Sequence, residues 1–184
     1  IVFGDWSSDV CSSDLIKFLT LQEILFFCPN YFSFEFFMQN KVVVITGASS
    51  GIGMALAKKY ASEGWNLVLA ARRIERLQEL KNQLNTVEVL PVKTDVTREE
   101  DCRELIKKAV ERFGKIDVLI NNAGISMRAL FENVDLQVIR QVMDVNFWGT
   151  VYCTKYALPH LLQAKGSLVG RSEEHTSELQ SPNT

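Results

Sequence analysis

Residues 42–53 read VVVITGASSGIG, and this stretch decides the fold. An apolar run suited to a buried strand leads into a turn with three glycines, and the amphipathic segment IGMALAKKYASEG follows from residue 52. Strands covered on both faces are almost entirely apolar, and they occur in parallel sheets whose strands are joined by helices. The stretch therefore predicts a buried strand, a tight turn and a crossover helix.

The same alternation continues along the chain. Short runs rich in Val, Ile and Leu are separated by longer amphipathic segments, which is typical of a parallel sheet with helices packed on it. Further strands are expected at residues 66–70, 87–92, 116–120 and 167–169, each buried on both faces. The sequence thus predicts an α/β fold, a doubly wound parallel sheet in a three-layer α/β/α arrangement, truncated after the fifth strand.

One connecting segment, TREEDCRELIKKAVERFG at 97–114, carries the clearest helix signals. Thr97 and Glu100 have the spacing of a capping box, and Gly114 is placed to end the helix. The apolar residues recur at helical spacing and share one face: Cys102, Leu105, Ile106, Ala109, Val110 and Phe113. The segment is predicted to be a helix that packs on the sheet.

The turn after the first strand has the composition of a phosphate-binding loop. Glycines let the backbone come close to a pyrophosphate, and the N–H groups and dipole of a helix N-terminus favour its negative charge. A glycine-rich turn can be purely structural, but here a strand precedes it and a helix follows it, as dinucleotide binding requires. The loop residues expected to contact the cofactor are Gly47, Ser49, Ser50, Gly51, Ile52 and Gly53.

Further motifs follow this loop in a fixed order. TGASSGIG at 46–53 has the spacing TGxxxGxG, NNAG stands at 121–124 after the fourth strand, and Asn146 lies in VNFWGT. With these motifs, residues 38–170 resemble the short-chain dehydrogenase/reductase family, whose fold is of the Rossmann type. The resemblance implies adenine contacts from Asp95 and Val96, and a wall beside the nicotinamide ribose built by the NNAG residues, among them Asn121, Ala123 and Gly124.

The end of the second strand bears on the choice of nicotinamide cofactor. An acidic residue there would hold a ribose 2′-hydroxyl, whereas a 2′-phosphate needs positive charge. Ala71 stands at the acidic position, and Arg72 and Arg73 follow it. The site therefore resembles the branch of the family that prefers NADP(H) to NAD(H). The alternative is that the two arginines are an ordinary solvated helix start.

The resemblance also implies a catalytic set, of which only one member is found. Asn146 matches the asparagine that holds a water of the family's proton relay; the alternative is a helix residue that bonds a neighbouring backbone. The family's Tyr-x-x-x-Lys pair is absent, because no tyrosine of the chain has a lysine four residues later. Tyr152 and Lys155 are three apart and precede the fifth strand, and Glu173 falls where the family's serine is expected.

The two ends of the chain are related to each other. A DNA sequence that encodes RSEEHTSELQS (171–181) has a reverse complement that encodes DWSSDVCSSDL (5–15). Both segments look like translated sequencing-adapter DNA and are set aside as non-native. The expected organisation is a non-native 1–37, in which 16–37 is translated non-coding sequence, an NAD(P)-binding domain at 38–170 and a non-native tail at 171–184.

These features predict an NAD(P)(H)-dependent oxidoreductase that interconverts a carbonyl and an alcohol by hydride transfer, although this chain would be inactive without the catalytic Ser, Tyr and Lys. A noncatalytic dinucleotide-binding or sensor protein is the alternative. The partner is a small-molecule carbonyl or alcohol. The helix expected around 134–163 resembles the one that such enzymes use to form homodimers or homotetramers, as expected of the complete protein; the alternative is that its apolar face serves the core of a monomer.

Other classes of function are disfavoured. A net charge of −2 does not call for nucleic acid, and the four cysteines show neither a CxxC pair nor metal-ligand spacing, which fits a reducing, cytoplasmic setting. The apolar stretch 16–27 is too short to span a membrane. Because later strands are expected to be missing, an edge of the sheet is predicted to be uncovered and the chain to self-associate.

Overall fold

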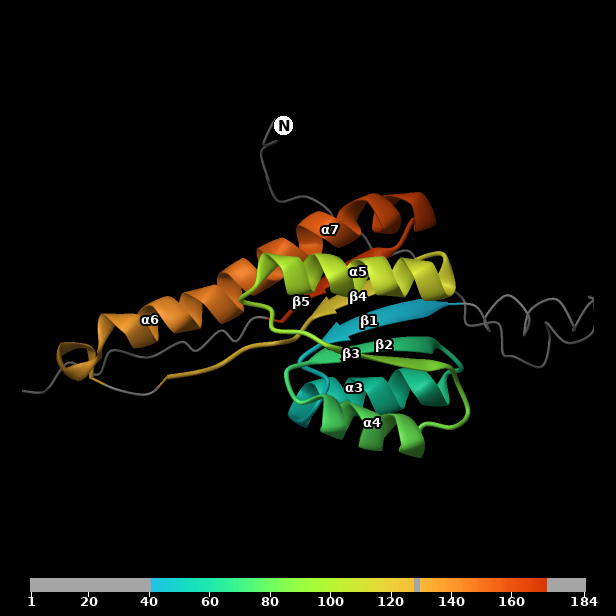
Figure 1. Ribbon diagram of the computed structural model, residues 1–184, viewed down its shortest axis with the longest axis horizontal. Helices are drawn as coiled ribbons and strands as arrows, with labels where there is room; N and C mark the ends of the chain where they lie inside the picture. Colours follow the sequence, from blue (N-terminus) through green and yellow to red (C-terminus); the bar gives the residue numbers. More distant parts are fainter. Residues whose placement is uncertain (1–40, 128–129, 172–184) are drawn as a thin grey trace, which may run out of the picture.

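A computed structural model describes residues 41–127 and 130–171 of the protein. Their strands form one parallel sheet in the order β3-β2-β1-β4-β5 (Figure 1). The strands are β1 Val42–Thr46, β2 Asn66–Ala71, β3 Val89–Lys93, β4 Val118–Asn121 and β5 Ser167–Gly170. The predicted parallel α/β sheet and its five strands are confirmed. Of the segments expected to be non-native, 1–37 and 171–184, only Arg171 lies among the described residues.

Helices cover both faces of the sheet. Helices α3 (Gly51–Ser62) and α4 (Ile74–Gln83) lie on one face, and α5 (Glu99–Phe113) and α7 (Gly149–Ala164) lie on the other (Figure 1). A short 3-10 helix η1 (Phe131–Asn133) precedes α6 (Leu136–Met143), and the π-helix η2 (Asp144–Trp148) joins α6 to α7 without a break. This confirms the long helix predicted around 134–163, and α6 extends beyond the carboxyl ends of the strands (Figure 1).

The apolar core is divided by the sheet into two clusters. Alternate residues of β1 enter them: Val42 and Val44 pack toward α5 and α7, whereas Val43 and Ile45 pack toward α3 and α4. All five residues of β1 are buried. The period of two in side-chain direction explains why this strand must be apolar throughout.

Strand β5 departs from the prediction that every strand is buried on both faces. Its four residues are exposed, and the side chains of Leu168 and Val169 remain 47% and 42% exposed. The strand pairs with β4 and touches α7, and it is an edge of the described sheet. An edge strand has a neighbour on one side only, so apolar composition alone does not bury it.

The start of α5 also corrects a prediction. Arg98 is the N-cap residue and α5 has no side-chain cap, so Thr97 and Glu100 do not form a capping box. Thr97 Oγ1 instead donates to Asp95 Oδ1 at 2.8 Å, because the nearer carboxylate competes for the hydroxyl. The helix ends as predicted at Gly114, which has φ 76°.

Helices α5 and α7 pack closely against each other. Each contributes a cysteine to their contact, and Cys102 and Cys153 are both 0% exposed in the same apolar cluster. The interaction with the Cys102 thiol, together with burial, raises the pKa of the Cys153 thiol far above its ordinary value. Both sulfurs are part of the apolar core, and that of Cys153 is held as the neutral thiol.

Candidate cofactor site

A cavity of about 270 Å³ lies at the carboxyl ends of the strands. The chain crosses from β1 to β2 on one face of the sheet and from β3 to β4 on the other, so the loops after β1 and β4 part here. Open α/β sheets bind ligands in this crevice. Its lining comprises Gly47, Ser49, Ser50, Gly51, Ile52, Ala70, Ala71, Arg72, Arg73, Thr94, Asp95, Val96, Asn122, Ala123, Gly124, Ile125, Val145 and Arg171.

Most of the residues predicted from the sequence therefore meet at one cavity. Three do not line it: Gly53, Asn121 and Asn146. Asn121 Nδ2 donates to Thr154 Oγ1 of α7 at 3.0 Å, and its Oδ1 is buried without a hydrogen-bond partner among the described residues. The first asparagine of NNAG thus supports α7, and its predicted contact with a cofactor has no counterpart in the cavity lining.

Two of the three glycines of the loop are required because a side chain there would collide with neighbouring atoms. Gly47 has φ 66°, and a Cβ there would lie 2.8 Å from Ala123 Cα. A Cβ on Gly53 would lie 2.5 Å from both Asn122 Nδ2 and the carbonyl oxygen of Gly47. These two glycines let the loop, the start of α3 and the NNAG segment pack at van der Waals distance.

The third glycine faces open space. Gly51 has φ 56°, and a Cβ there would meet no heavy atom within 4 Å. It is the first residue of α3, whose N-cap residue Ser50 makes no side-chain hydrogen bond and whose first turn has no acidic residue. The first turn of α5, by contrast, holds three carboxylates. The N-terminus of α3 therefore keeps its partial positive charge and its N–H donors, which fits a pyrophosphate.

Thr46 and Asn122 join the two loops that form the crevice. Thr46 Oγ1 accepts hydrogen bonds from the N–H groups of Asn122 and Ala123, both at 3.0 Å, and donates to the carbonyl oxygen of Ile120. Asn122 Nδ2 donates in return to the carbonyl oxygen of Thr46 at 2.9 Å. Sequence analysis placed Thr46 in the motif but gave it no role, because the bonds that define its role join residues 76 positions apart.

The wall on the β2 side is basic. Arg72 and Arg73 are exposed, line the cavity and immediately precede α4. Ala71 has no carboxylate to offer, and Asp95 is the only acidic side chain among the described residues that line the cavity. The arginines therefore bring positive charge to a cavity that is also lined by the N-terminus of α3.

The loop after β3 approaches α7 very closely. A Cβ on Gly149, the first residue of α7, would lie 2.8 Å from Cγ2 of Val96. Only glycine lets the helix pass at this distance. The long helix and the loop that holds Asp95 and Val96 are therefore fixed relative to each other.

Asn146 lies in the π-helix and bonds to a backbone segment. Its Oδ1 accepts from the N–H of Ile125 and its Nδ2 donates to the carbonyl oxygen of Ile125, both at 2.9 Å. This geometry is the alternative considered for Asn146, and it secures the segment that follows NNAG. A π-helical turn at such a point is typical of functional sites, because it releases backbone groups from the regular ladder.

Tyr152 and Lys155 take no part in the cavity lining. Lys155 Nζ and Tyr156 Oη instead donate to Glu99 Oε1 at 3.0 and 2.6 Å, which links α7 to α5. The hydrogen bond from Tyr156, followed by that from Lys155, lowers the pKa of Glu99, and the same bond raises the pKa of Tyr156. These groups tie two helices together at the surface.

Arg171 is a cavity residue that sequence analysis missed, because it assigned residues 171–184 to a non-native tail. Its backbone N–H donates to the carbonyl oxygen of Asn121 at 3.1 Å, and its Nη1 donates to Asn122 Oδ1 at 3.4 Å. It thus extends the pairing of β5 with β4 and brings a cation to the NNAG side of the cavity.

Known proteins resemble this chain over the same region. A family model described as short chain dehydrogenase matches residues 41–173. An 11-beta-hydroxysteroid dehydrogenase A from Sesamum indicum is 45% identical over 161 residues, covering 79% of this chain and 46% of that protein. The 11-beta-hydroxysteroid dehydrogenase 1A of Arabidopsis thaliana is 42% identical, covering 84% of this chain and 49% of that protein.

Solved structures also resemble this chain. An alcohol dehydrogenase from the archaeon Thermococcus sibiricus, complexed with 5-hydroxy-NADP, has a TM-score of 0.68 at 37% identity, covering 70% of this chain and 56% of that chain. A short chain dehydrogenase/reductase from Burkholderia phymatum in complex with NAD has a TM-score of 0.67 at 34% identity, covering 71% of this chain and 47% of that chain.

The protein belongs to the short chain dehydrogenase family, a family of oxidoreductases that bind NAD(P)(H). It spans about half the length of the curated relatives that it matches. Among the described residues, no helix combines the length and the apolar character needed to cross a membrane.

Proposed function

We propose that residues 38–170 are the NADP(H)-binding part of an oxidoreductase that interconverts a carbonyl and an alcohol. The observation that carries this proposal is the cavity between the uncapped N-terminus of α3 and the exposed pair Arg72 and Arg73. A dinucleotide with a 2′-phosphate has negative charge at both of these positions. The cofactor, when bound, supplies or accepts the hydride.

Each wall of the cavity then has its own task. The N–H groups of Gly51 and Ile52 would bind the pyrophosphate, as the open space beside Gly51 allows. Asp95 and Val96 would contact the adenine, and Ala123 and Gly124 would line the nicotinamide ribose side. Gly53 and Asn121 would contribute without touching the cofactor. Gly53 would let the loop pack closely, and Asn121 would hold α7 in place. Asn146 would hold the segment at Ile125, which borders the cavity, and retain its predicted part in the proton relay.

The preference for NADP(H) rests on the two arginines. The solved relatives include one complex with 5-hydroxy-NADP and another with NAD, so membership of the family is compatible with either cofactor. In this chain no carboxylate stands at the end of β2, and guanidinium groups bind phosphate through several donors at once. A 2′-phosphate is thereby favoured over a free 2′-hydroxyl.

The substrate of the whole protein is proposed to be a small-molecule carbonyl or alcohol. Similar proteins are named hydroxysteroid dehydrogenases, which makes a secondary alcohol on a fused-ring skeleton the first class to assay. A second candidate function is dinucleotide binding without catalysis. It is supported by the cavity at the carboxyl ends of the strands, which a dinucleotide could occupy without any catalytic group.

The cofactor proposal is tested by titrating the purified chain with NADPH and NADH and following nicotinamide fluorescence. We expect NADPH to bind about tenfold or more tightly than NADH, since one charge-assisted phosphate contact is worth about 1.5–3 kcal/mol. The double variant Arg72→Ser, Arg73→Ser should abolish the difference. Equal binding of both cofactors by the unaltered chain would contradict the preference, and binding of neither would contradict the function.

Self-association is proposed through the long helix. Large apolar side chains are exposed on it at Phe147, Trp148, Leu158 and Leu162, the last of them 70% exposed. Patches of this kind mark surfaces that other protein covers. Light scattering behind a size-exclusion column tests the proposal: a homodimer or homotetramer is expected, and a sharp monomer peak would contradict it.

The domain limits and the setting are proposed on sequence grounds. The complementary coding of 5–15 and 171–181 supports a native domain at 38–170. The absence of a CxxC pair from the sequence supports a cytoplasmic protein with unpaired thiols. Sequencing the source gene across the codons of Gly170 and Arg171 tests the limit. A genomic sequence that encodes RSEEHTSELQS would contradict it and would favour the noncatalytic candidate.

A further inference from the structure

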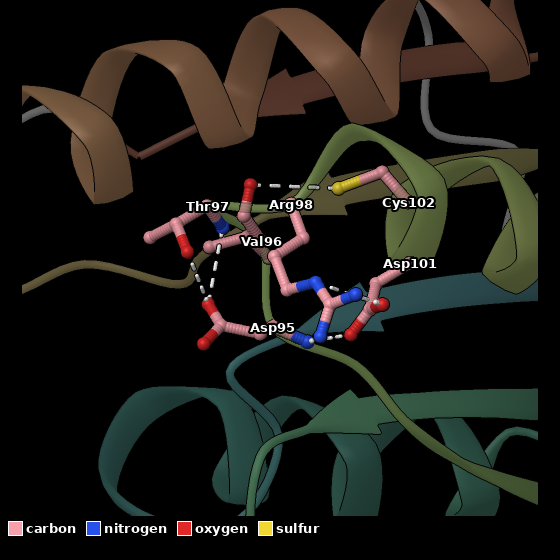
Figure 2. A network of polar contacts seen from close by, with 6 residues as sticks. All are labelled: Asp95, Val96, Thr97, Arg98, Asp101 and Cys102. Carbon is pink, nitrogen blue, oxygen red and sulfur yellow. Dashed lines mark hydrogen bonds and ion pairs between the residues drawn. The ribbon is translucent and has the colours of Figure 1, made fainter.

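The loop between β3 and α5 forms the adenine side of the proposed site. Figure 2 shows its polar network. Asp95 Oδ1 accepts from the N–H and the hydroxyl of Thr97 at 3.1 and 2.8 Å, so one carboxylate oxygen fixes the turn within the loop. To the described part of the chain, Asp95 Oδ2 makes no hydrogen bond, and this oxygen is available to a donor on a ligand.

The first turn of α5 holds this loop from outside. Asp101 Oδ2 accepts from the backbone N–H of Asp95 at 3.0 Å, and its Oδ1 lies 3.7 Å from Nε of Arg98 (Figure 2). The thiol of the next residue, Cys102, lies 3.5 Å from the carbonyl oxygen of Val96. Asp101 thus contacts both the second residue, Asp95, and the last residue, Arg98, of the loop between β3 and α5.

We propose that Asp101 is a positioning residue for the adenine side of the dinucleotide site. The proposal rests on the proposed function and adds a residue that does not itself line the cavity. A hydrogen bond to an ionised acceptor is stronger than one between neutral groups, and the Asp101 side chain is only 28% exposed. Fixing the Asp95 backbone orients its carboxylate before a ligand arrives, which removes an ordering cost from binding.

The neighbouring Glu100 offers a matched control. It occupies the same first turn of α5 and carries the same charge, but its side chain is exposed and makes no hydrogen bond or ion pair with the described loop. Replacing either residue removes one negative charge from the same helix terminus, so the effects on the helix dipole are alike. A difference between the two variants therefore reports the contacts of Asp101 with the loop, which are the bond to the Asp95 N–H and the ion pair with Arg98.

The experiment uses the full 184-residue chain and two halves of the cofactor. The probes are 2′,5′-ADP, which contains the adenine side, and reduced nicotinamide mononucleotide, which does not. Displacement of NADPH followed by fluorescence gives both dissociation constants for the unaltered chain and for Asp101→Ala, Asp101→Asn and Glu100→Ala. Hydrogen exchange at the Asp95 amide is measured on the same samples without ligand.

We expect Asp101→Ala to weaken 2′,5′-ADP binding about tenfold, the equivalent of one charge-assisted hydrogen bond, and to leave mononucleotide binding within about twofold. Exchange at the Asp95 amide should accelerate. Asp101→Asn, which keeps an oxygen acceptor, should restore most of the affinity, and Glu100→Ala should resemble the unaltered chain.

Other outcomes overturn the proposal in recognisable ways. Equal weakening of both probes by Asp101→Ala, or an equal effect of Glu100→Ala, would mean general destabilisation or a charge effect. Normal 2′,5′-ADP binding by Asp101→Ala would refute the positioning role and leave the proposed function standing. If the unaltered chain binds no dinucleotide, the proposed function fails together with this inference, and exchange at the Asp95 amide still shows whether Asp101 holds the loop.

Discussion

Strands β1 and β5 both contain a run of apolar residues, but one strand is buried and the other is exposed. Both run parallel to β4, and both contain adjacent apolar residues, yet all five residues of β1 are buried and all four of β5 are exposed. The difference lies in their neighbours: β1 has a strand on each side and helices on both faces, whereas β5 is an edge of the described sheet. An apolar composition allows a strand to be buried, but the position of the strand in the sheet decides whether it is buried.

The carboxyl ends of the two strands differ in the same way. The loop after β1 is packed so closely that added atoms would collide with the NNAG segment, whereas a Cβ on Gly170 at the end of β5 would meet no heavy atom within 4 Å. Close packing at one end fixes the geometry of a candidate binding site. The other end carries no comparable constraint among the described residues.

The strongest test of the comparison removes the same kind of side chain from each strand. Ile45→Ala in β1 should lower the free energy of unfolding by about 2–5 kcal/mol, because it leaves a cavity in a fully buried site. Val169→Ala in β5 should cost no more than about 1 kcal/mol, since its side chain is already in contact with water. Urea denaturation measures both. Equal losses would show that β5 is covered in solution.

A second test adds a methyl group in the first turn of α3, which follows β1, and at the last residue of β5. Gly53→Ala places a Cβ 2.5 Å from a backbone oxygen that cannot move freely, and we expect a loss of about 1–3 kcal/mol in stability together with loss of NADPH binding. Gly170→Ala should leave both quantities nearly unchanged. Thermal melting and fluorescence titration provide the measurements. Retention of binding by Gly53→Ala would contradict the close-packed loop.

A third test concerns polar groups on the two strands. Thr46→Val keeps the shape of the side chain but leaves the N–H groups of Asn122 and Ala123 without their acceptor, at an expected cost of about 1–3 kcal/mol. Ser167→Ala, on an exposed strand, should cost less than about 0.5 kcal/mol. Chemical denaturation distinguishes them. A neutral Thr46→Val variant would mean that water replaces the hydroxyl in the crevice.

The smallest expected effect lies on the surface of the helical layer next to β5. The bond to Glu99 raises the pKa of Tyr156, so its contribution to stability is present below the ordinary tyrosine pKa of 10.0 and is lost as the pH rises further. The pKa of Glu99 is lowered from 4.5, so its contribution is present above that pH and is lost in more acidic solution.

Alkaline titration of phenolate absorbance tests this surface link. Tyr156 should ionise at a higher pH than in the variant Glu99→Gln, and a Tyr156→Phe variant identifies its signal among the four tyrosines. The shift should be small, since exposed ion pairs contribute little. An unchanged titration in Glu99→Gln would show that the contact is not maintained in solution.

The sequence was sufficient for the features that depend on short-range patterns. The apolar runs predicted the strands, and the TGxxxGxG spacing predicted the loop. The amphipathic segments predicted the helices that cover the sheet. It failed where two local rules compete: Thr97 and Glu100 have capping-box spacing, but Asp95 is nearer and takes the Thr97 hydroxyl. A pattern states which bonds are possible, and distances decide which one forms.

Bonds that join different elements of the fold were also beyond sequence reasoning. The pairing of Thr46 with Asn122 and the contact of Asp101 with the Asp95 backbone leave no periodic signature, because each depends on how strands and helices are placed. The exposure of Leu168 and Val169 has the same origin, since a strand does not encode how many neighbours it has. These are properties of the assembled sheet.

The buried cysteines between α5 and α7 can be used to time the separation of these two helices. Cys102 and Cys153 are both 0% exposed, and a thiol reagent reacts only with a sulfur that it can reach as a thiolate. Labelling of their two peptides, followed by mass spectrometry, therefore proceeds no faster than the helices separate. The rate of that reaction, compared with the rate in denaturant, gives the lifetime of the closed helical layer without any bound ligand.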